Sequence, residues 1–118
     1  MYRLIIQAHF DAAHHLPHYK GACARIHGHR WLIRGIWQAG NSELKDGMIA
    51  DFKELRSALN KEASVYDHQD LNTMIPNPTA EMIALTIFKV LLNYPYGKYL
   101  IGIEIEESPG CVVRYSEE

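Results

Sequence analysis

The sequence predicts an α+β fold in which an antiparallel sheet packs against a pair of helices. Two strand-like segments come first, two helical segments follow, and two strand-like segments end the chain. No single helix links successive strands, as a parallel sheet would require, so the order ββααββ favours antiparallel pairing. The length of 118 residues is that of one domain, and we expect residues 1–118 to form a single domain.

The first two strands are expected to form a long hairpin-like pair. Residues 2–13 are rich in β-branched and aromatic side chains, and residues 27–38 alternate between two faces. Residues 15–25, between them, contain Pro and Gly and have no hydrophobic period, which predicts a loop. A turn region follows over residues 39–47. The apolar side chains that share one face of the second segment are Trp31, Ile33 and Trp37.

Two helices are expected in the middle of the chain. Asp51, followed three residues later by Glu54, is typical of a helix start. Apolar residues then recur at spacings of three and four, which predicts one buried stripe up to residue 64. They are Phe52, Leu55, Ala58, Leu59 and Ala63. After a loop over residues 65–78, a second helix is predicted from about Thr79 to Asn93. It is apolar around most of its circumference, so we expect burial on more than one side.

Two strands are expected to complete the sheet. Residues 99–107 alternate, a Pro109-Gly110 turn follows, and a short strand starts at Cys111, which we expect to be buried. With both helices on one face of a four-stranded sheet, the other face and the edges remain open. The sequence therefore predicts a homo-oligomer.

Composition and charge exclude several classes of function. Twelve Lys and Arg residues against fourteen Asp and Glu residues give a net charge of −2, which argues against a nucleic-acid groove or an anionic membrane surface as partner. The longest apolar run, Met82 to Leu92, is too short to span a bilayer. The N-terminus has no secretory cleavage site, which predicts a cytoplasmic protein with both cysteines, Cys23 and Cys111, reduced.

Histidine clustering predicts a metal site. Six of the seven histidines lie in the first quarter of the chain: His9, His14, His15, His18, His27 and His29. His27 and His29 point to the same face of a strand, about 7 Å apart, and can bind one ion together. His14, at the end of the neighbouring strand, is the best third ligand. Three histidines with an open fourth position are typical of catalytic zinc. The competing interpretation is that the His-x-His pair arose by chance in a histidine-rich strand.

Other side chains suit acid–base work. Cys23 lies just before the histidine pair, where a cation would favour its thiolate; alternatively it is a structural cysteine or a fourth ligand that closes the site. Asp67 and His68 place a carboxylate beside an imidazole. Glu107 continues the apolar face of its strand, so it either reaches solvent at the strand end or is held by a polar partner or ligand. Thr79 is expected to cap a helix.

Six ordered motifs resemble those of the 6-pyruvoyltetrahydropterin synthase superfamily and cover nearly the whole chain. They are Phe10-Asp11-Ala12-Ala13-His14, Cys23-x3-His27-Gly28-His29, Gly47-Met48-x2-Asp51-Phe52-x2-Leu55, Asp67-His68-x2-Leu71-Asn72, Asn77-Pro78-Thr79-x-Glu81 and Glu107-Ser108. The three residues between the cysteine and the first histidine resemble the bacterial 6-carboxytetrahydropterin synthase branch, since the pyruvoyl branch typically has five. Two departures are His15, where the family often has a basic residue, and a Glu106-Glu107-Ser108 run in place of a single Glu-Thr.

The resemblance implies the tunnelling fold (T-fold), a four-stranded antiparallel sheet with two helices on one face. In this fold, subunits assemble into an oligomeric barrel, usually a hexamer. The implied reaction converts 7,8-dihydroneopterin triphosphate to 6-carboxy-5,6,7,8-tetrahydropterin with release of acetaldehyde and triphosphate, in queuosine biosynthesis. Two alternatives remain. One is a 6-pyruvoyltetrahydropterin synthase, and the other is a non-catalytic zinc-binding module. A cupin-like oxygenase is disfavoured by the helix pair.

The resemblance also implies a role for each site residue. The ligands of Zn²⁺ would be His14, His27 and His29. Cys23 would remove a proton from the substrate side chain, and His68, oriented by Asp67, would be its partner in proton transfer. Glu107 would clamp the amino-pyrimidine edge of the pterin. The pterin pocket would be shaped in part by Thr79 and Glu81.

Overall fold

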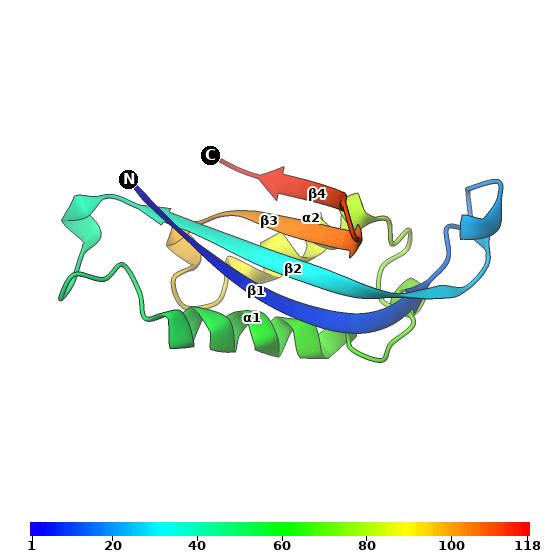
Figure 1. Cartoon of the computed structure of the whole chain (residues 1–118), viewed down its shortest axis with the longest axis horizontal. Coiled ribbons are helices and arrows are strands. Elements are labelled where there is room, and N and C mark those ends of the chain that lie inside the picture. The colour runs from blue at the N-terminus through cyan, green and yellow to red at the C-terminus, as the bar shows by residue number, and fades with distance from the viewer.

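The computed structural model describes all 118 residues and contains one four-stranded antiparallel sheet in the order β1-β2-β3-β4. Two helices lie against the same face of that sheet, α1 along β1 and α2 behind β3 in the view of Figure 1. The elements are β1 (Tyr2–His14), β2 (His27–Ala39), α1 (Phe52–Tyr66), α2 (Ala80–Leu91), β3 (Leu100–Ser108) and β4 (Cys111–Ser116). The α+β class and the ββααββ order are confirmed. Neither helix has the length and apolar character needed to cross a bilayer.

The long β1–β2 hairpin determines which side chains meet at its open end. Its register pairs residues one to one, from Tyr2 opposite Ala39 to His14 opposite His27. Side chains alternate between the two faces of a strand, so His14, His27 and His29 all project from the face that carries the core. Further along the same face Phe10 and Trp31 stack, with ring centroids 6.1 Å apart. The histidines therefore continue the hydrophobic core at its end.

Helix α1 differs from the expected stripe in two ways. It continues to Tyr66, beyond the predicted end at residue 64, because the Tyr66 ring packs against Phe10 in the core. Phe52, expected in the stripe, is 59% exposed. Glu62 is buried instead, at 3% exposure. Asp51 does cap the helix, and its carboxylate accepts a hydrogen bond from the backbone N–H of Lys53.

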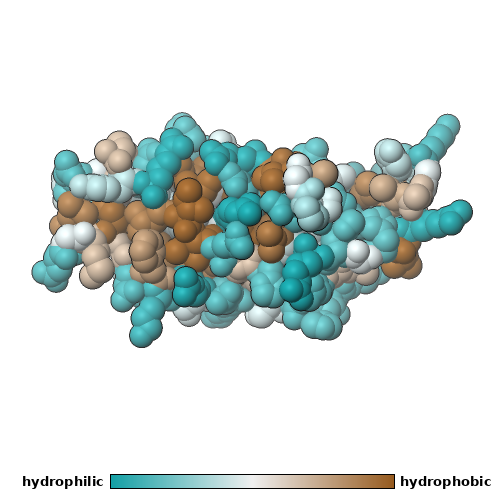
Figure 2. All heavy atoms as spheres, viewed as in Figure 1, coloured by the Kyte–Doolittle hydropathy of each residue, from teal (hydrophilic) through white to brown (hydrophobic).

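Two expected burials are wrong for the single chain. Helix α2 buries one face and leaves Met82 and Val90 exposed, because two layers give a helix only one packing surface. Leu92, the residue that ends the helix, is exposed as well. Cys111 is exposed as well, because it begins an edge strand that pairs only with β3. The sheet face turned toward the viewer carries further apolar side chains, which gather in the left half of Figure 2.

Residues 67–72 cover the outer edge of the second half of β1. The N–H of His68 donates to the carbonyl of Asp11 (2.6 Å), and the N–H of Ala13 donates to the carbonyl of Gln69 (3.0 Å). At His15, the side chain of Asn72 binds both the backbone N–H and the backbone carbonyl, each over 2.9 Å. This segment fixes the end of β1, while the first half of β1 keeps an unpaired edge.

Candidate metal centre

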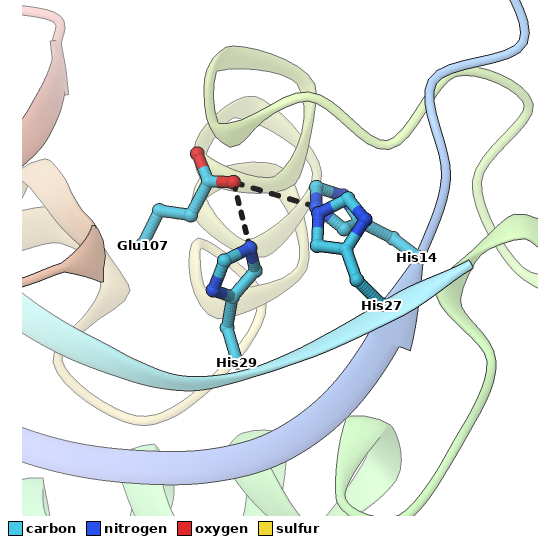
Figure 3. Close-up of side chains that lie close together, drawn as sticks. All are labelled: His14, His27, His29 and Glu107. Carbon is cyan, nitrogen blue, oxygen red and sulfur yellow. Dashed lines mark ion pairs between the residues drawn. The ribbon is translucent and has the colours of Figure 1, made fainter. Parts of the chain in front are cut away.

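Three histidines and one glutamate converge where β1 ends, β2 begins and β3 ends (Figure 3). One ring nitrogen from each of His14, His27 and His29 and one carboxylate oxygen of Glu107 lie within 4.8 Å of one another. The backbone explains the grouping. His14 and His27 are register partners, and His29 lies two residues further along the same face.

Backbone carbonyls fix the orientation of two of the rings. Nδ1 of His14 donates to the carbonyl oxygen of Pro78 over 2.8 Å, and Nδ1 of His27 donates to that of Arg25 over 2.7 Å. A carbonyl only accepts, so Nδ1 carries the proton and Nε2 keeps a free lone pair. Such outer partners are the usual support of metal-binding histidines. Trp31 packs edge-on against His14, whose side chain is only 1% exposed.

Two nitrogen atoms at this point have no hydrogen-bond partner. Nε2 of His14 and Nε2 of His29 are both buried, and neither makes a hydrogen bond. Buried polar atoms without partners are rare because each one loses its hydration without compensation. The Oε1 atom of Glu107 lies 3.4 Å from Nε2 of His14 and 3.0 Å from Nε2 of His29, within ion-pair range. Two ligands of one tetrahedral zinc ion, with bonds of about 2.0–2.1 Å, lie about 3.4 Å apart. The residues therefore fit a metal ion.

Burial favours the neutral form of the His29 imidazole. Burial lowers the pKa of His29 below its ordinary value of 6.5, and this effect outweighs the opposing attraction of Glu107. Metal ions bind the neutral form of histidine, so His29 is prepared for coordination at neutral pH. A set of imidazoles and one carboxylate suits a divalent transition metal.

Asp67 and His68 form a contacting pair outside this group. Nδ1 of His68 lies 2.9 Å from Oδ2 of Asp67, and the His68 ring is 81% exposed. His68 has a left-handed backbone conformation (φ 58°), which non-glycine residues adopt mainly at turns and functional sites. The pKa of the Asp67 carboxyl is lowered, first by the hydrogen bond from the Asp11 N–H and then by that from His68. His68 and His29 line one shallow depression beside β1.

Cys23 also lies outside the metal group. It is half-buried in a short 3-10 turn over Ala22–Ala24, and its carbonyl accepts a hydrogen bond from the Leu16 N–H (2.8 Å). The fourth candidate ligand atom grouped with the three imidazole nitrogens belongs to Glu107 and not to Cys23.

Thr79 and Glu81 begin helix α2. The Thr79 hydroxyl accepts the backbone N–H of Met82 over 3.2 Å, so it caps the helix, and Glu81 is exposed in the first turn. Neither belongs to the metal group. The residue before the cap, Pro78, holds His14. Sequence patterns do not indicate this contact, because it uses a backbone carbonyl and joins positions 64 residues apart.

The fold and this site together define an α+β subunit with a candidate metal centre of three histidines and one carboxylate. Residues 3–118 match the sequence profile of the 6-pyruvoyl tetrahydropterin synthase family. The chain belongs to this family.

Relatives in this family have different names. The chain is 36% identical over 114 residues to the 6-carboxy-5,6,7,8-tetrahydropterin synthase of Synechocystis, covering 90% of this chain and 86% of that protein. It is 35% identical over 86 residues to a putative 6-carboxy-5,6,7,8-tetrahydropterin synthase of Archaeoglobus fulgidus (73% and 72% covered). It is also 34% identical over 85 residues to the dihydroneopterin monophosphate aldolase of Pyrococcus furiosus (72% and 70% covered).

A solved structure confirms the fold. The 6-pyruvoyl tetrahydropterin synthase of Caenorhabditis elegans superposes with a TM-score of 0.84 and 21% identity, covering 99% of this chain and 96% of that one. The expected T-fold subunit is therefore confirmed.

Proposed function

We propose that this chain is a zinc-dependent 6-carboxy-5,6,7,8-tetrahydropterin synthase, a carbon–carbon lyase. Its substrates are 7,8-dihydroneopterin triphosphate and water, and its products are 6-carboxytetrahydropterin, acetaldehyde and triphosphate, in queuosine biosynthesis in the cytoplasm. Two relatives named for this activity and the Cys-x3-His-x-His spacing support the proposal. The observation that carries it is the convergence of three imidazole nitrogens, two of them buried without a hydrogen-bond partner.

The three histidines hold the metal in this proposal. His14, His27 and His29 each offer a ring nitrogen to one Zn²⁺. When bound, Zn²⁺ supplies a Lewis acid for the side-chain oxygens of the pterin. Hydrogen bonds to Pro78 and Arg25 keep two of these rings in place before any ligand arrives.

Proton transfer is assigned to Cys23 and His68. The Cys23 thiolate accepts a proton from the substrate side chain, and His68 is its partner in proton transfer. The hydrogen bond to Asp67 orients the His68 ring. Neither side chain belongs to the group of candidate metal ligands. This supports a role in contacting the substrate and not the metal.

We assign binding of the pterin ring to residues at the end of β3 and at the start of α2. Glu107 clamps the amino-pyrimidine edge, because two carboxylate oxygens match two adjacent N–H donors. Thr79 and Glu81 contribute to the wall of the pterin pocket.

We further propose that residues 1–118 act as a single domain and that subunits assemble as a homo-oligomer, a hexamer being favoured. The unpaired edges of β4 and of the first half of β1 support assembly.

Product analysis tests the proposal directly. Zinc-loaded protein incubated with 7,8-dihydroneopterin triphosphate should release acetaldehyde together with 6-carboxytetrahydropterin. The Cys23→Ala variant should keep its zinc and lose turnover. A 6-pyruvoyl product without acetaldehyde would identify the pyruvoyl activity instead. Because one relative is named an aldolase, dihydroneopterin monophosphate should be assayed in parallel, and preferential cleavage of it would contradict the proposal.

A further inference from the structure

We propose that Glu107 is an exchangeable fourth metal ligand. Its carboxylate closes the metal site when no pterin is bound, and it leaves the metal when a pterin arrives. This inference rests on the proposed function for the identity of the incoming ligand. It assigns Glu107 two successive positions, on the metal first and on the amino-pyrimidine edge afterwards.

The distances favour a shared metal ion over a simple ion pair. Oε1 of Glu107 lies 3.0 Å from Nε2 of His29 and 3.4 Å from Nε2 of His14, yet neither nitrogen makes a hydrogen bond. In an ion pair of this length, an imidazole N–H would normally point at the carboxylate oxygen and form a hydrogen bond. Atoms that bind the same tetrahedral ion are instead held about 3.4 Å apart, with their lone pairs directed at the ion. The carboxylate therefore lies where a fourth ligand belongs.

The three histidines and the glutamate differ in how firmly they are held. His14 is buried and hydrogen-bonded to Pro78, and His27 is hydrogen-bonded to Arg25. Both belong to the regular β1–β2 ladder. These rings form a fixed platform.

Glu107 stands at an irregularity of the sheet. The register of β3 with β4 shifts between Glu106 and Ser108, so Glu107 lies at the shift and has no pairing partner there. Its side chain is 31% exposed. Figure 3 shows one carboxylate oxygen facing the histidines and the other pointing away from them. A side chain with this freedom can leave the platform without disturbing it.

The two positions exclude each other. A pterin clamp needs both carboxylate oxygens for two N–H donors, and the structure commits one of them to the histidine group. Pterin binding therefore has to release Glu107 from the metal. The exchange keeps the carboxylate paired in both states and opens a metal position only when substrate is present.

Cobalt(II) tests the exchange without any turnover. The d–d absorption of bound Co²⁺ depends on the number and type of its ligands, so it reports whether Glu107 coordinates. Substituting Glu107→Gln should change the spectrum of the pterin-free protein. It should also weaken Co²⁺ binding by at least roughly 10- to 100-fold, which is the typical effect of losing a residue that only orients a metal ligand. Adding neopterin to the unmodified protein should change its spectrum in turn. This second change is expected because the pterin replaces the Glu107 carboxylate as the fourth ligand of the metal.

Two further variants separate coordination from folding. Glu107→Asp keeps the charge but shortens the reach, and it should behave as Glu107→Gln does. Glu106→Gln alters the adjacent carboxylate, which pairs with Arg34 and not with the histidines, and its spectrum should match that of the unmodified protein. An unchanged spectrum in Glu107→Gln, or an unmodified protein whose spectrum ignores saturating neopterin, would overturn the inference. A failed acetaldehyde assay with these spectral changes intact would overturn the proposed reaction alone.

Discussion

The carbonyl oxygen of Pro78 accepts a hydrogen bond from Nδ1 of His14 over 2.8 Å. This contact joins the residue before the cap of helix α2 to a buried histidine at the end of β1. Since a carbonyl cannot donate, it also determines which nitrogen of His14 is free. The helix start and the candidate metal centre are therefore mechanically linked.

The first prediction tests this link. Thr79→Ala removes the cap of α2 and should cost about 1 kcal/mol of unfolding free energy. It should also weaken zinc binding, because the adjacent Pro78 carbonyl orients His14. Asp51→Ala, which removes the cap of α1, is the matched control, and it should reduce stability similarly while leaving zinc affinity unchanged. Urea unfolding and competition with a chelating dye measure the two effects. Equal zinc affinity in both variants would contradict the link.

A second prediction concerns the buried Glu62. Its carboxyl group accepts hydrogen bonds from the hydroxyls of Tyr66 (2.7 Å) and Tyr94 (3.2 Å). Burial, followed by the contact with Glu62, raises the pKa of Tyr66. Glu62→Ala leaves the Tyr66 hydroxyl without its partner and should lower the unfolding free energy by roughly 1–3 kcal/mol. The exposed Glu81→Ala should change it by less than about 0.5 kcal/mol. Equal effects of the two substitutions would show that the network does not stabilise the fold.

A third prediction follows from the lowered pKa of His29. In the folded, metal-free protein this ring resists protonation because it is buried, whereas in the unfolded chain it titrates near 6.5. The unfolded state therefore binds more protons below that pH. Stability should be complete above about pH 6.5 and should fall as the pH is lowered. Unfolding in chelator between about pH 7.5 and pH 5.5 should show this loss.

Two variants identify the source of this loss. His29→Asn should flatten the pH dependence, whereas His9→Asn, at an exposed histidine, should leave it unchanged. A curve that keeps its slope in His29→Asn would assign the dependence to other groups.

A fourth prediction concerns the unpaired edge of β1. The N–H groups of Asp11 and Ala13 face the edge that residues 67–72 cover, and the strand register is regular. By alternation, the N–H of Ile5 faces the same edge where it is unpaired. Ile5→Pro should leave the subunit folded, since a free edge tolerates proline, and should reduce assembly. Sedimentation velocity measures this, with Ile5→Thr as the control that retains the N–H. Full assembly of Ile5→Pro would place the interface elsewhere.

Much of the fold follows from local sequence signals. The alternation in residues 27–38, the Asp51 cap and the apolar spacing of both helices all predict elements that the structure contains. Expectations about burial were less successful. Cys111 lies in an apolar segment but on an edge strand, and Phe52 has helical spacing but lies at the helix start, away from the core. Edge position and helix rotation depend on tertiary packing, which periodicity does not specify.

The candidate metal centre was likewise predictable only in part. The grouping of His14 with the His27 and His29 pair could be predicted, because hairpin register and alternation determine it. Glu107 was expected at the pterin, but its contact with the histidines could not be predicted, because it depends on an irregularity in the pairing of β3 with β4. The sequence also gives no sign that Asn72 clamps the backbone of His15, since such contacts join distant segments.

Metal analysis tests the central claim most directly. Protein purified without added chelator and dialysed against metal-free buffer should hold one zinc ion per chain. His29→Ala should lose that zinc, and His9→Ala, at an exposed histidine outside the group, should retain it. Zinc far below one equivalent in the unmodified protein, or full zinc retention in His29→Ala, would contradict the assignment of these imidazoles to a metal.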